Sequence, residues 1–240
     1  MPRLFCDTPL AVNQEIKLPK ELTRHLMVLR LAIGENITLF NGHGGEYTGR
    51  LINISKNDAI VKITHYHPIE RELPYNITLA QGLPEANKMD WIVEKTTELG
   101  VNTILPIAAE RSVTRLDNDR AIKRIERWQA ITIAAAQQCG RNHLPHILPP
   151  LPFSKIIEHT HSPCLLLSPR ATQTLTSWAK QHPPQNITLL IGPEGGFSPK
   201  EEQSALNSGA TLLSIGSRIL RTETAGMAII AMLNALWELS

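Results

Sequence analysis

The sequence has little that would mark a secreted, disulfide-stabilised or membrane-embedded protein. Its 240 residues include only three cysteines, and Cys6, Cys139 and Cys164 are spaced like neither a disulfide framework nor a zinc site. No apolar run approaches the length that crosses a bilayer. The first twelve residues contain proline and Asp7 instead of the apolar segment of a signal peptide. We therefore expect a soluble protein of the reducing cytoplasm, with no membrane partner.

The sequence also lacks a charge excess and a metal-binding cluster. Its formal net charge is only +2, whereas nucleic-acid-binding modules often carry a strong basic excess. Charge alone therefore does not predict an RNA partner. The nine histidines are scattered without supporting cysteines or carboxylates, so we expect no metal site.

Two domains are expected along the chain. Residues 1–70 hold a short amphipathic stretch (20–31) and then β-rich runs (37–40, 46–54 and 59–65) separated by Asn, Gly and Asp turns, which favours a compact antiparallel barrel. Prolines at 68 and 74 mark the boundary. Residues 74–240 alternate strands (76–83, 101–107) with helices (88–99), the rhythm of an α/β domain with a parallel sheet.

The most informative stretch is residues 186–226. An apolar strand (187–191) stops at the sequence GPEGG, and Ser198, Pro199 and Glu201 then carry the N-cap signals of a helix. A second strand (211–215) ends at Gly216, and a third (164–168) ends at Ser168 and Pro169. Open α/β sheets bind ligands beyond the carboxyl ends of their strands, so these loops predict a ligand site.

The ligand is not expected to be a phosphate. A phosphate loop needs a Gly-Lys-Ser/Thr sequence, and both it and the dinucleotide fingerprint are missing here. Glu194 within the glycine loop would repel a pyrophosphate but suits a neutral or cationic ligand. The alternative is a tight strand-to-helix turn that binds nothing.

Four further features bear on partners. Residues 110–127 carry six basic residues against four acids, which indicates either an RNA-facing strip or a solvated helix surface. Arg141 and Asn142 follow this helix and are suited to phosphate or base contacts. The last helix, 222–239, is apolar over more than one face, which favours a subunit partner beside the sheet. Lys88 and Lys95 are expected, by default, to lie on a solvent-exposed helix surface.

Four ordered motifs carry a family resemblance: KMDWIVEKTTELGV (88–101), QQCGRNHLP (137–145), IGPEGGFSPKE (191–201) and IGSRILRTETA (215–225). Together they resemble the RsmE family of 16S rRNA uridine-N3 methyltransferases, which belongs to the SPOUT superfamily of knotted methyltransferases. The similarity extends over nearly the whole chain. It departs from the family pattern at Ile215, where leucine is usual, and at residues 84–86, which are less basic than usual.

The resemblance implies a PUA-like RNA-binding barrel followed by a trefoil-knotted α/β domain, and a homodimer that methylates 16S rRNA in the small ribosomal subunit. The methyl donor would be S-adenosylmethionine, which leaves as S-adenosylhomocysteine and needs no metal. By the same resemblance Arg221, Glu223 and Arg141 would lie nearest the acceptor uracil. The donor would contact Leu166, Leu167, Ser168, Pro169, Ile191, Gly192, Pro193, Glu194, Gly195, Gly196, Ile215, Gly216, Leu220, Arg221, Thr222 and Thr224.

Alternatives remain at this point. One alternative is a non-enzymatic RNA-binding or ribosome-assembly protein whose glycine loops are only turns. A less favoured alternative is a nucleotide-using enzyme. The barrel could instead serve only to support folding or dimer formation. Glu223 could instead complement the dipole at the start of the last helix. Arg141 could instead bind an RNA phosphate without contacting the base.

Overall fold

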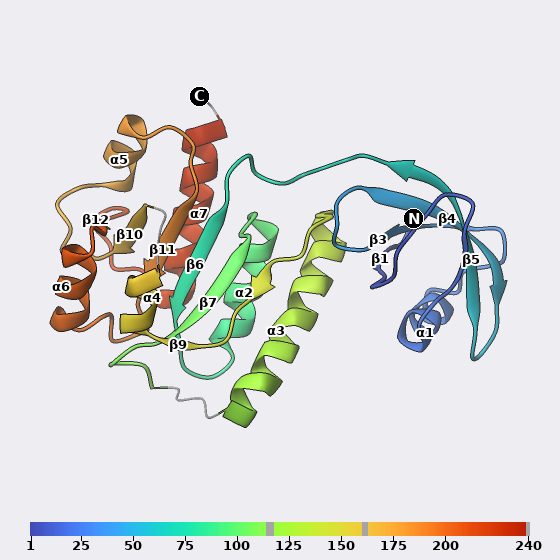
Figure 1. The fold of residues 1–240 in the computed structure, drawn as a ribbon, viewed down its shortest axis with the longest axis horizontal. Helices are drawn as coiled ribbons and strands as arrows, with labels where there is room; N and C mark the ends of the chain where they lie inside the picture. The colour runs from blue at the N-terminus through green and yellow to red at the C-terminus, as the bar shows by residue number, and fades with distance from the viewer. Residues whose placement is uncertain (114–117, 160–162, 239–240) are drawn as a thin grey trace. The chain divides into compact units, whose positions relative to one another are not determined.

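The computed structural model describes residues 1–113, 118–159 and 163–238, which form two compact units (Figure 1). The first unit comprises Met1–Glu72 together with Ala136–Leu144, and the second comprises Leu73–Ala135 together with Pro145–Ser240. The linear division expected from the sequence, 1–70 and 74–240, therefore differs from the structure at residues 136–144, which return to the first unit.

The first unit is a five-stranded sheet with one helix. The strands are β1 (Arg3–Phe5), β2 (Glu15–Lys17), β3 (Asn36–Phe40), β4 (Glu46–Ile54) and β5 (Ala59–His67), in the order β1-β3-β4-β5-β2, and the helix is α1 (Lys20–Val28). Leu26 of α1 packs among buried strand residues such as Ile37, Val61 and Ile63. The sheet is not purely antiparallel as expected, because β1 pairs parallel with β3.

Two arginines of the first unit explain why residues 136–144 belong to it. Arg3 donates to the carbonyl oxygens of Ala136 (3.0 Å) and Arg141 (2.8 Å), and Arg71 donates to that of Gly140 (2.8 Å). These bonds hold the end of α3 (Asn118–Cys139) and the two residues after it to the first unit. No local sequence pattern signals such long-range contacts.

The second unit is built on one sheet whose paired strands are all parallel. Its strands are β6 (Ile77–Gly82), β7 (Thr103–Ala108), β8 (His146–Ile147), β10 (Cys164–Leu167), β11 (Ile187–Ile191) and β12 (Thr211–Leu213), in the order β12-β10-β11-β6-β7-β8, with β9 (Leu151–Pro152) beside β7. The carboxyl ends of β10, β11 and β12 therefore share one edge.

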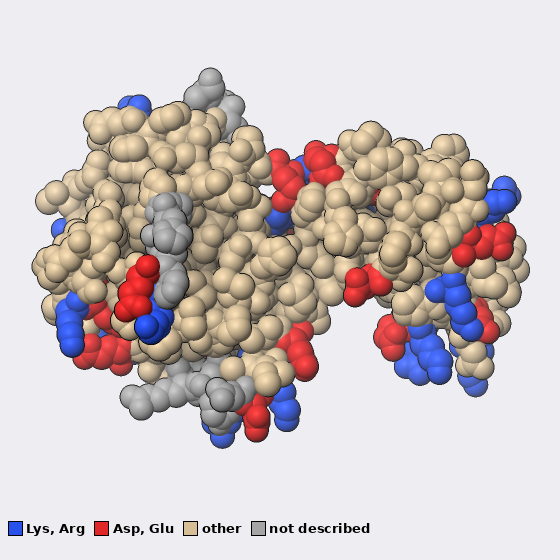
Figure 2. Space-filling model, in the orientation of Figure 1, with Lys and Arg blue, Asp and Glu red and all other residues tan. Residues whose placement is uncertain are grey.

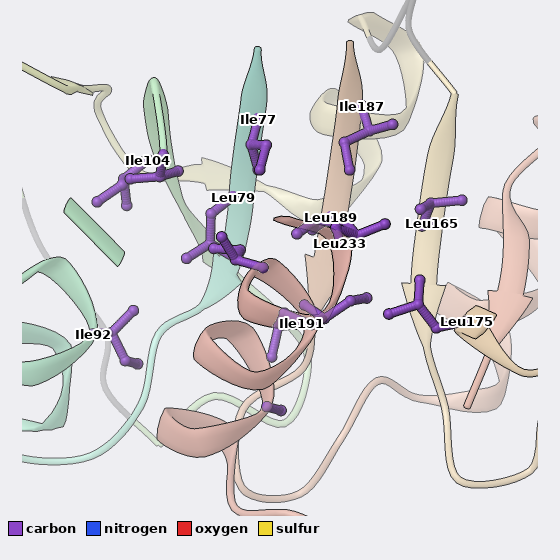
Figure 3. Packing of buried hydrophobic residues seen from close by; sticks show 14 of the residues in the cluster. Ile77, Leu79, Ile92, Ile104, Leu165, Leu175, Ile187, Leu189, Ile191 and Leu233 are labelled. Carbon is purple, nitrogen blue, oxygen red and sulfur yellow. The ribbon is translucent and has the colours of Figure 1, made fainter. Parts of the chain in front are cut away.

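Helices cover both faces of this sheet, so its central strand is apolar on both sides. Ile187, Leu189 and Ile191 of β11 pack with α2 (Lys88–Glu98), α3, α5 (Leu175–Gln181) and α7 (Thr222–Glu238), as Figure 3 shows for part of this core. Leu190 points into a second core with α4 (Phe153–His159) and α6 (Pro199–Asn207). All five residues of β11 are buried.

Local helix signals agree with the structure. Ser198 and Glu201 form the capping box expected at the start of α6, with Pro199 as its first residue. Gly100, expected to end α2, has a left-handed φ of 96°. The sequence analysis did not identify the short strands β1, β2, β8 and β9 or the seven-residue helices α4 and α5, which are too brief to show a period.

The last helix is better covered than its composition suggested. Ile229, Ile230, Leu233 and Trp237 are buried in the first core of the second unit, and Met232 and Leu236 pack partly buried against it. The helix contacts α2, α5 and β11. Its large apolar side chains therefore do not by themselves require a subunit partner. Within the described ranges, no helix combines the length and the hydropathy needed to span a membrane.

Candidate active site

A pocket of about 550 Å³ lies in the second unit at the shared carboxyl edge of β10, β11 and β12. Its walls are the loops that follow these strands, at residues 168–170, 192–197 and 214–221. Because neighbouring parallel strands point the same way, loops far apart in the sequence meet here. The volume lies within the range of small-molecule sites, about 300–1,000 Å³.

Most of the sequence-predicted donor residues line this pocket. The structure brings together Leu167, Ser168, Pro169, Ile191, Gly192, Pro193, Glu194, Gly195, Gly196, Ile215, Gly216, Leu220, Arg221 and Thr222. Two others lie outside the lining. Leu166 is fully buried in the core shared with α4 and α6, and Thr224 is an exposed residue in the first turn of α7. A strand alternates its side chains between two faces, so Leu166 and Leu167 cannot both face the pocket.

Two glycines give the pocket its backbone-lined surface. Gly192 has no room for a side chain, since a β-carbon there would lie 3.0 Å from Gly196 Cα and from the Phe197 nitrogen. Gly216 has a φ of +126° and open space around the position of a β-carbon. The loop after β11 is thus folded tightly on itself, while the loop after β12 leaves its backbone open to a ligand.

A buried chain of hydrogen bonds joins the loops to the sheet. Gln81 is fully buried near the end of β6 and donates through Nε2 to Gly82 O (3.0 Å) and to Thr222 Oγ1 (2.9 Å). Thr222 Oγ1 in turn donates to the Gly192 carbonyl at 2.6 Å. The start of α7 is therefore fixed against the glycine loop. Gln81 Oε1 accepts no hydrogen bond from any residue in the described ranges.

The carboxylate of the glycine loop is not free. Glu194 Oε1 accepts from Lys88 Nζ at 2.7 Å and from the Glu85 backbone N–H at 3.2 Å, and Lys88 also pairs with Glu85. Burial acts to raise the pKa of Glu194, but the hydrogen bonds from Lys88 and from backbone N–H groups outweigh it, so the net pKa is lowered. The hydrogen bond to Glu194 is also the main reason why the pKa of Lys88 is raised. The expected attraction of Glu194 for a cationic ligand is therefore partly offset by Lys88.

Several lining residues were missed by the sequence analysis. They are Lys88, Arg111, Arg170, Phe197, Glu202, Ser214, Arg218, Ile219 and Ala225. Arg111 donates to the Gly195 carbonyl at 3.0 Å, and Arg170 pairs with Glu202 at 2.5 Å. One signal was present: β6 and β7 also end at this edge, so the residues after them, near Lys88 and Arg111, were candidates.

Arg221 lies at the pocket, and Glu223 lies beside it. Arg221 is exposed and lines the cavity, whereas Glu223 is half-buried and outside the lining. Glu223 Oε2 is buried and has no hydrogen-bond partner in the described part of the chain. The charge of Glu223 helps to raise the pKa of Lys88, so the two groups are close enough to interact.

Arg141, the third residue expected near the acceptor, belongs to the first unit. Only 3% of the residue is exposed, and its guanidinium binds the Glu72 carboxylate through two hydrogen bonds of 2.9 and 2.5 Å within the first unit. The structure thus shows a contact of Arg141 within the first unit. Its expected role near the uracil stays a prediction.

The described residues contain no group of three or more His, Cys, Asp or Glu side chains arranged to hold a metal ion. The pocket offers backbone groups, apolar side chains from Ile191, Ile215 and Leu220, and charged groups at its rim. Such a lining fits an uncharged ring system with a polar or charged tail, such as S-adenosylmethionine.

Comparisons with known proteins agree with this geometry. A family profile described as an RNA methyltransferase domain matches residues 71–234, and one described as an RNA methyltransferase PUA domain matches residues 18–64. A ribosomal RNA small subunit methyltransferase E from Buchnera aphidicola is 32% identical over 99% of this chain and 94% of its own length. The chain belongs to this methyltransferase family. The predicted membership and enzyme class are therefore confirmed.

A further relative and two solved structures show the same relation. The Bacillus subtilis protein is 31% identical over 91% of this chain and 89% of its own length. A crystal structure of the Neisseria gonorrhoeae protein bound to S-adenosylmethionine is 40% identical, with a TM-score of 0.92 over 99% of this chain and 98% of that one. A Legionella pneumophila structure in complex with the same cofactor is 33% identical, with a TM-score of 0.91 over 97% and 96% of the two chains.

The contact between Arg141 and Glu72 predicts a stability change. Replacing Arg141 by Ala leaves Glu72 as a largely buried, unpaired carboxylate, and removing one partner of a buried pair typically lowers the free energy of unfolding by about 3–5 kcal/mol. Lys17→Ala is the control, because Lys17 and its partner Asp58 are both exposed, at 68% and 43%; its loss should cost about 0–1 kcal/mol. Urea denaturation of both variants tests the difference, and equal changes would contradict the structural role.

Proposed function

We propose that this protein transfers the methyl group of S-adenosylmethionine to N3 of a uridine in the 16S rRNA of the small ribosomal subunit. The observation that carries the proposal is the backbone-lined pocket at the joined ends of β10, β11 and β12. Further support comes from the family, and from the relative of 40% identity whose crystal structure holds the donor. The uridine position N3 comes from the motif resemblance.

The pocket supplies what such a donor needs. Ile191, Ile215 and Leu220 offer apolar walls for an adenine ring, and the open backbone at Gly216 offers hydrogen-bonding groups. Glu194 and Lys88 together place a charged pair at the rim, suited to an amino-acid tail that carries both signs. When bound, the donor supplies a methyl group already activated by its sulfonium, so the protein needs no metal for this step.

The protein's own residues must make the uracil a nucleophile. N3 of uracil is protonated at neutral pH, so its proton must leave as the new bond forms. Arg221 lines the pocket and forms no ion pair with any residue of the described ranges, so its guanidinium is suited to stabilise the developing negative charge. Glu223, whose Oε2 is buried without a partner among the described residues, is the proposed proton acceptor. Helix-dipole compensation at the start of α7 is its alternative role.

Other parts of the assignment follow from the resemblance. We propose that the first unit, which includes the PUA match, contacts the RNA, that the chain of the second unit is knotted, and that the protein acts in the cytoplasm. The homodimer also rests on the resemblance, since the burial of α7 gives it little support. A monomeric mass in light scattering at micromolar concentration would contradict the dimer.

The decisive experiment for the proposal is methyl transfer from labelled donor into purified small subunits that lack the modification, followed by mapping of the modified base. We expect label in 16S rRNA at one uridine, on N3. Absence of transfer would support the alternative of a non-enzymatic RNA-binding or assembly protein. Label on another atom or base would contradict the proposed specificity.

Donor placement predicts a contrast between two glycines. Gly216 and Gly209 both have left-handed φ angles, +126° and +89°, and open space at the β-carbon position, so alanine strains both by about 1 kcal/mol. Only Gly216 lines the pocket. Calorimetry should show S-adenosylmethionine affinity reduced at least about tenfold in Gly216→Ala, equivalent to about 1.4 kcal/mol, and unchanged in Gly209→Ala. Unchanged affinity in a folded Gly216→Ala protein would refute this placement.

The catalytic roles predict losses in the chemical step. With donor and subunits both saturating, Arg221→Ala and Glu223→Gln should each lower the single-turnover rate by about 100-fold, the usual effect of losing one such group. Arg127→Ala, away from the pocket, should retain the wild-type rate. A residue that only contacts phosphate would instead weaken binding and reduce its salt dependence. Wild-type single-turnover rates in both Arg221→Ala and Glu223→Gln would show that these residues are not catalytic.

A further inference from the structure

The rim of the pocket carries one unusually exposed apolar side chain. Ile219, in the loop between β12 and α7, is 82% exposed, and no other large hydrophobic residue in the described ranges is more exposed. Single exposed apolar residues are common on protein surfaces. Ile219 differs because it lines the mouth of the candidate active site.

The loop that carries Ile219 is held firmly on both sides. Ile215 before it and Leu220 after it pack partly buried against the core of the second unit. Thr222 then binds the Gly192 carbonyl at 2.6 Å. The isoleucine is therefore the tip of an anchored loop, at a fixed place beside the pocket.

Two arginines flank this tip. Arg218 and Arg221 line the same pocket as Ile219 and are exposed, and within the described ranges neither side chain forms a hydrogen bond or an ion pair. The other cations of the lining differ, since Lys88 pairs with Glu194, Arg170 pairs with Glu202, and Arg111 donates to the Gly195 carbonyl. On the face shown in Figure 2, too, many Lys and Arg side chains lie beside Asp and Glu. Two unpaired guanidinium groups around an apolar tip suit RNA, which offers phosphates and base faces together.

We propose that Ile219 inserts into the RNA at the position vacated by the target base, while Arg218 contacts the adjoining phosphate. This inference rests on the proposed function. An enzyme that modifies a ring atom must take the base out of its stack, and unstacking is unfavourable. Apolar side chains that insert between base steps hold such openings in other nucleic-acid complexes. Ile219 is thus a positioning residue, which acts on the base through the RNA.

The test compares two RNA substrates at saturating donor. One is a structured fragment of 16S rRNA containing the mapped target uridine, and the other is the same fragment with an abasic nucleotide beside that uridine, which interrupts the stack beforehand. We expect Ile219→Ala to lower the single-turnover rate on the intact fragment about tenfold or more, because the unstacking energy is no longer offset. On the abasic fragment its rate should return to within about threefold of wild type, and Ile219→Leu should retain most activity on both.

Controls separate this role from others. Leu206→Ala, on α6 at 41% exposure and outside the pocket lining, should leave both rates unchanged. Because Ile219 lines the pocket, both rates are measured at saturating donor, so that a change in donor affinity does not affect the comparison. Arg218→Ala should reduce the salt dependence of RNA binding by about one phosphate contact.

Three outcomes would overturn the inference. They are a wild-type rate for Ile219→Ala on the intact fragment, an equal loss on both fragments, and a change of mass in light scattering, which would show that Ile219 contacts a second copy of the chain. A wild-type protein that transfers no methyl group would overturn the proposed function, and this inference with it. Normal wild-type transfer with an unaffected Ile219→Ala variant would overturn this inference alone.

Discussion

A short buried chain of hydrogen bonds determines how the pocket is built. Gln81 donates to Thr222 at 2.9 Å, and Thr222 donates to the Gly192 carbonyl at 2.6 Å, across sequence separations of 141 and 30 residues. The first bond joins the end of β6 to the start of α7, and the second joins α7 to the glycine loop. The amide orientation is fixed, because only Nε2 can donate to both Gly82 O and Thr222 Oγ1. The loops on either side of the pocket thus lie at a set distance from each other.

The parallel sheet supplies the rest of this arrangement. Since β10, β11 and β12 point the same way, their carboxyl ends expose loops at one edge, and the tight packing around Gly192 leaves backbone instead of side chains on one wall. Charge is distributed unevenly around the pocket. Lys88 and Arg170 are neutralised by acids, whereas Arg218 and Arg221 are not. A net charge of +2 conceals this local difference, which is why composition alone did not indicate RNA.

Features that depend on local sequence were predictable. The capping box of Ser198 and Glu201, the end of α2 at Gly100 and the glycine loops after two strands were all expected from neighbouring residues, and the structure has them. The family motifs added the cofactor and the RNA substrate, which periodicity does not reveal. Predictions that depended on long-range contacts fared less well. Nothing near Arg141 announces that Glu72 will hold it, and no local pattern marks Gln81 or the return of residues 136–144 to the first unit.

The central claim is that this hydrogen-bonded junction builds the donor site, and Thr222→Val tests it most directly. Valine keeps the shape of threonine but cannot accept from Gln81 or donate to Gly192. Calorimetry should show S-adenosylmethionine affinity about tenfold or more below wild type, a loss of about 1.4 kcal/mol, with Thr222→Ser close to wild type because its hydroxyl restores both bonds. A folded Thr222→Val protein that binds the donor as tightly as wild type would contradict the account.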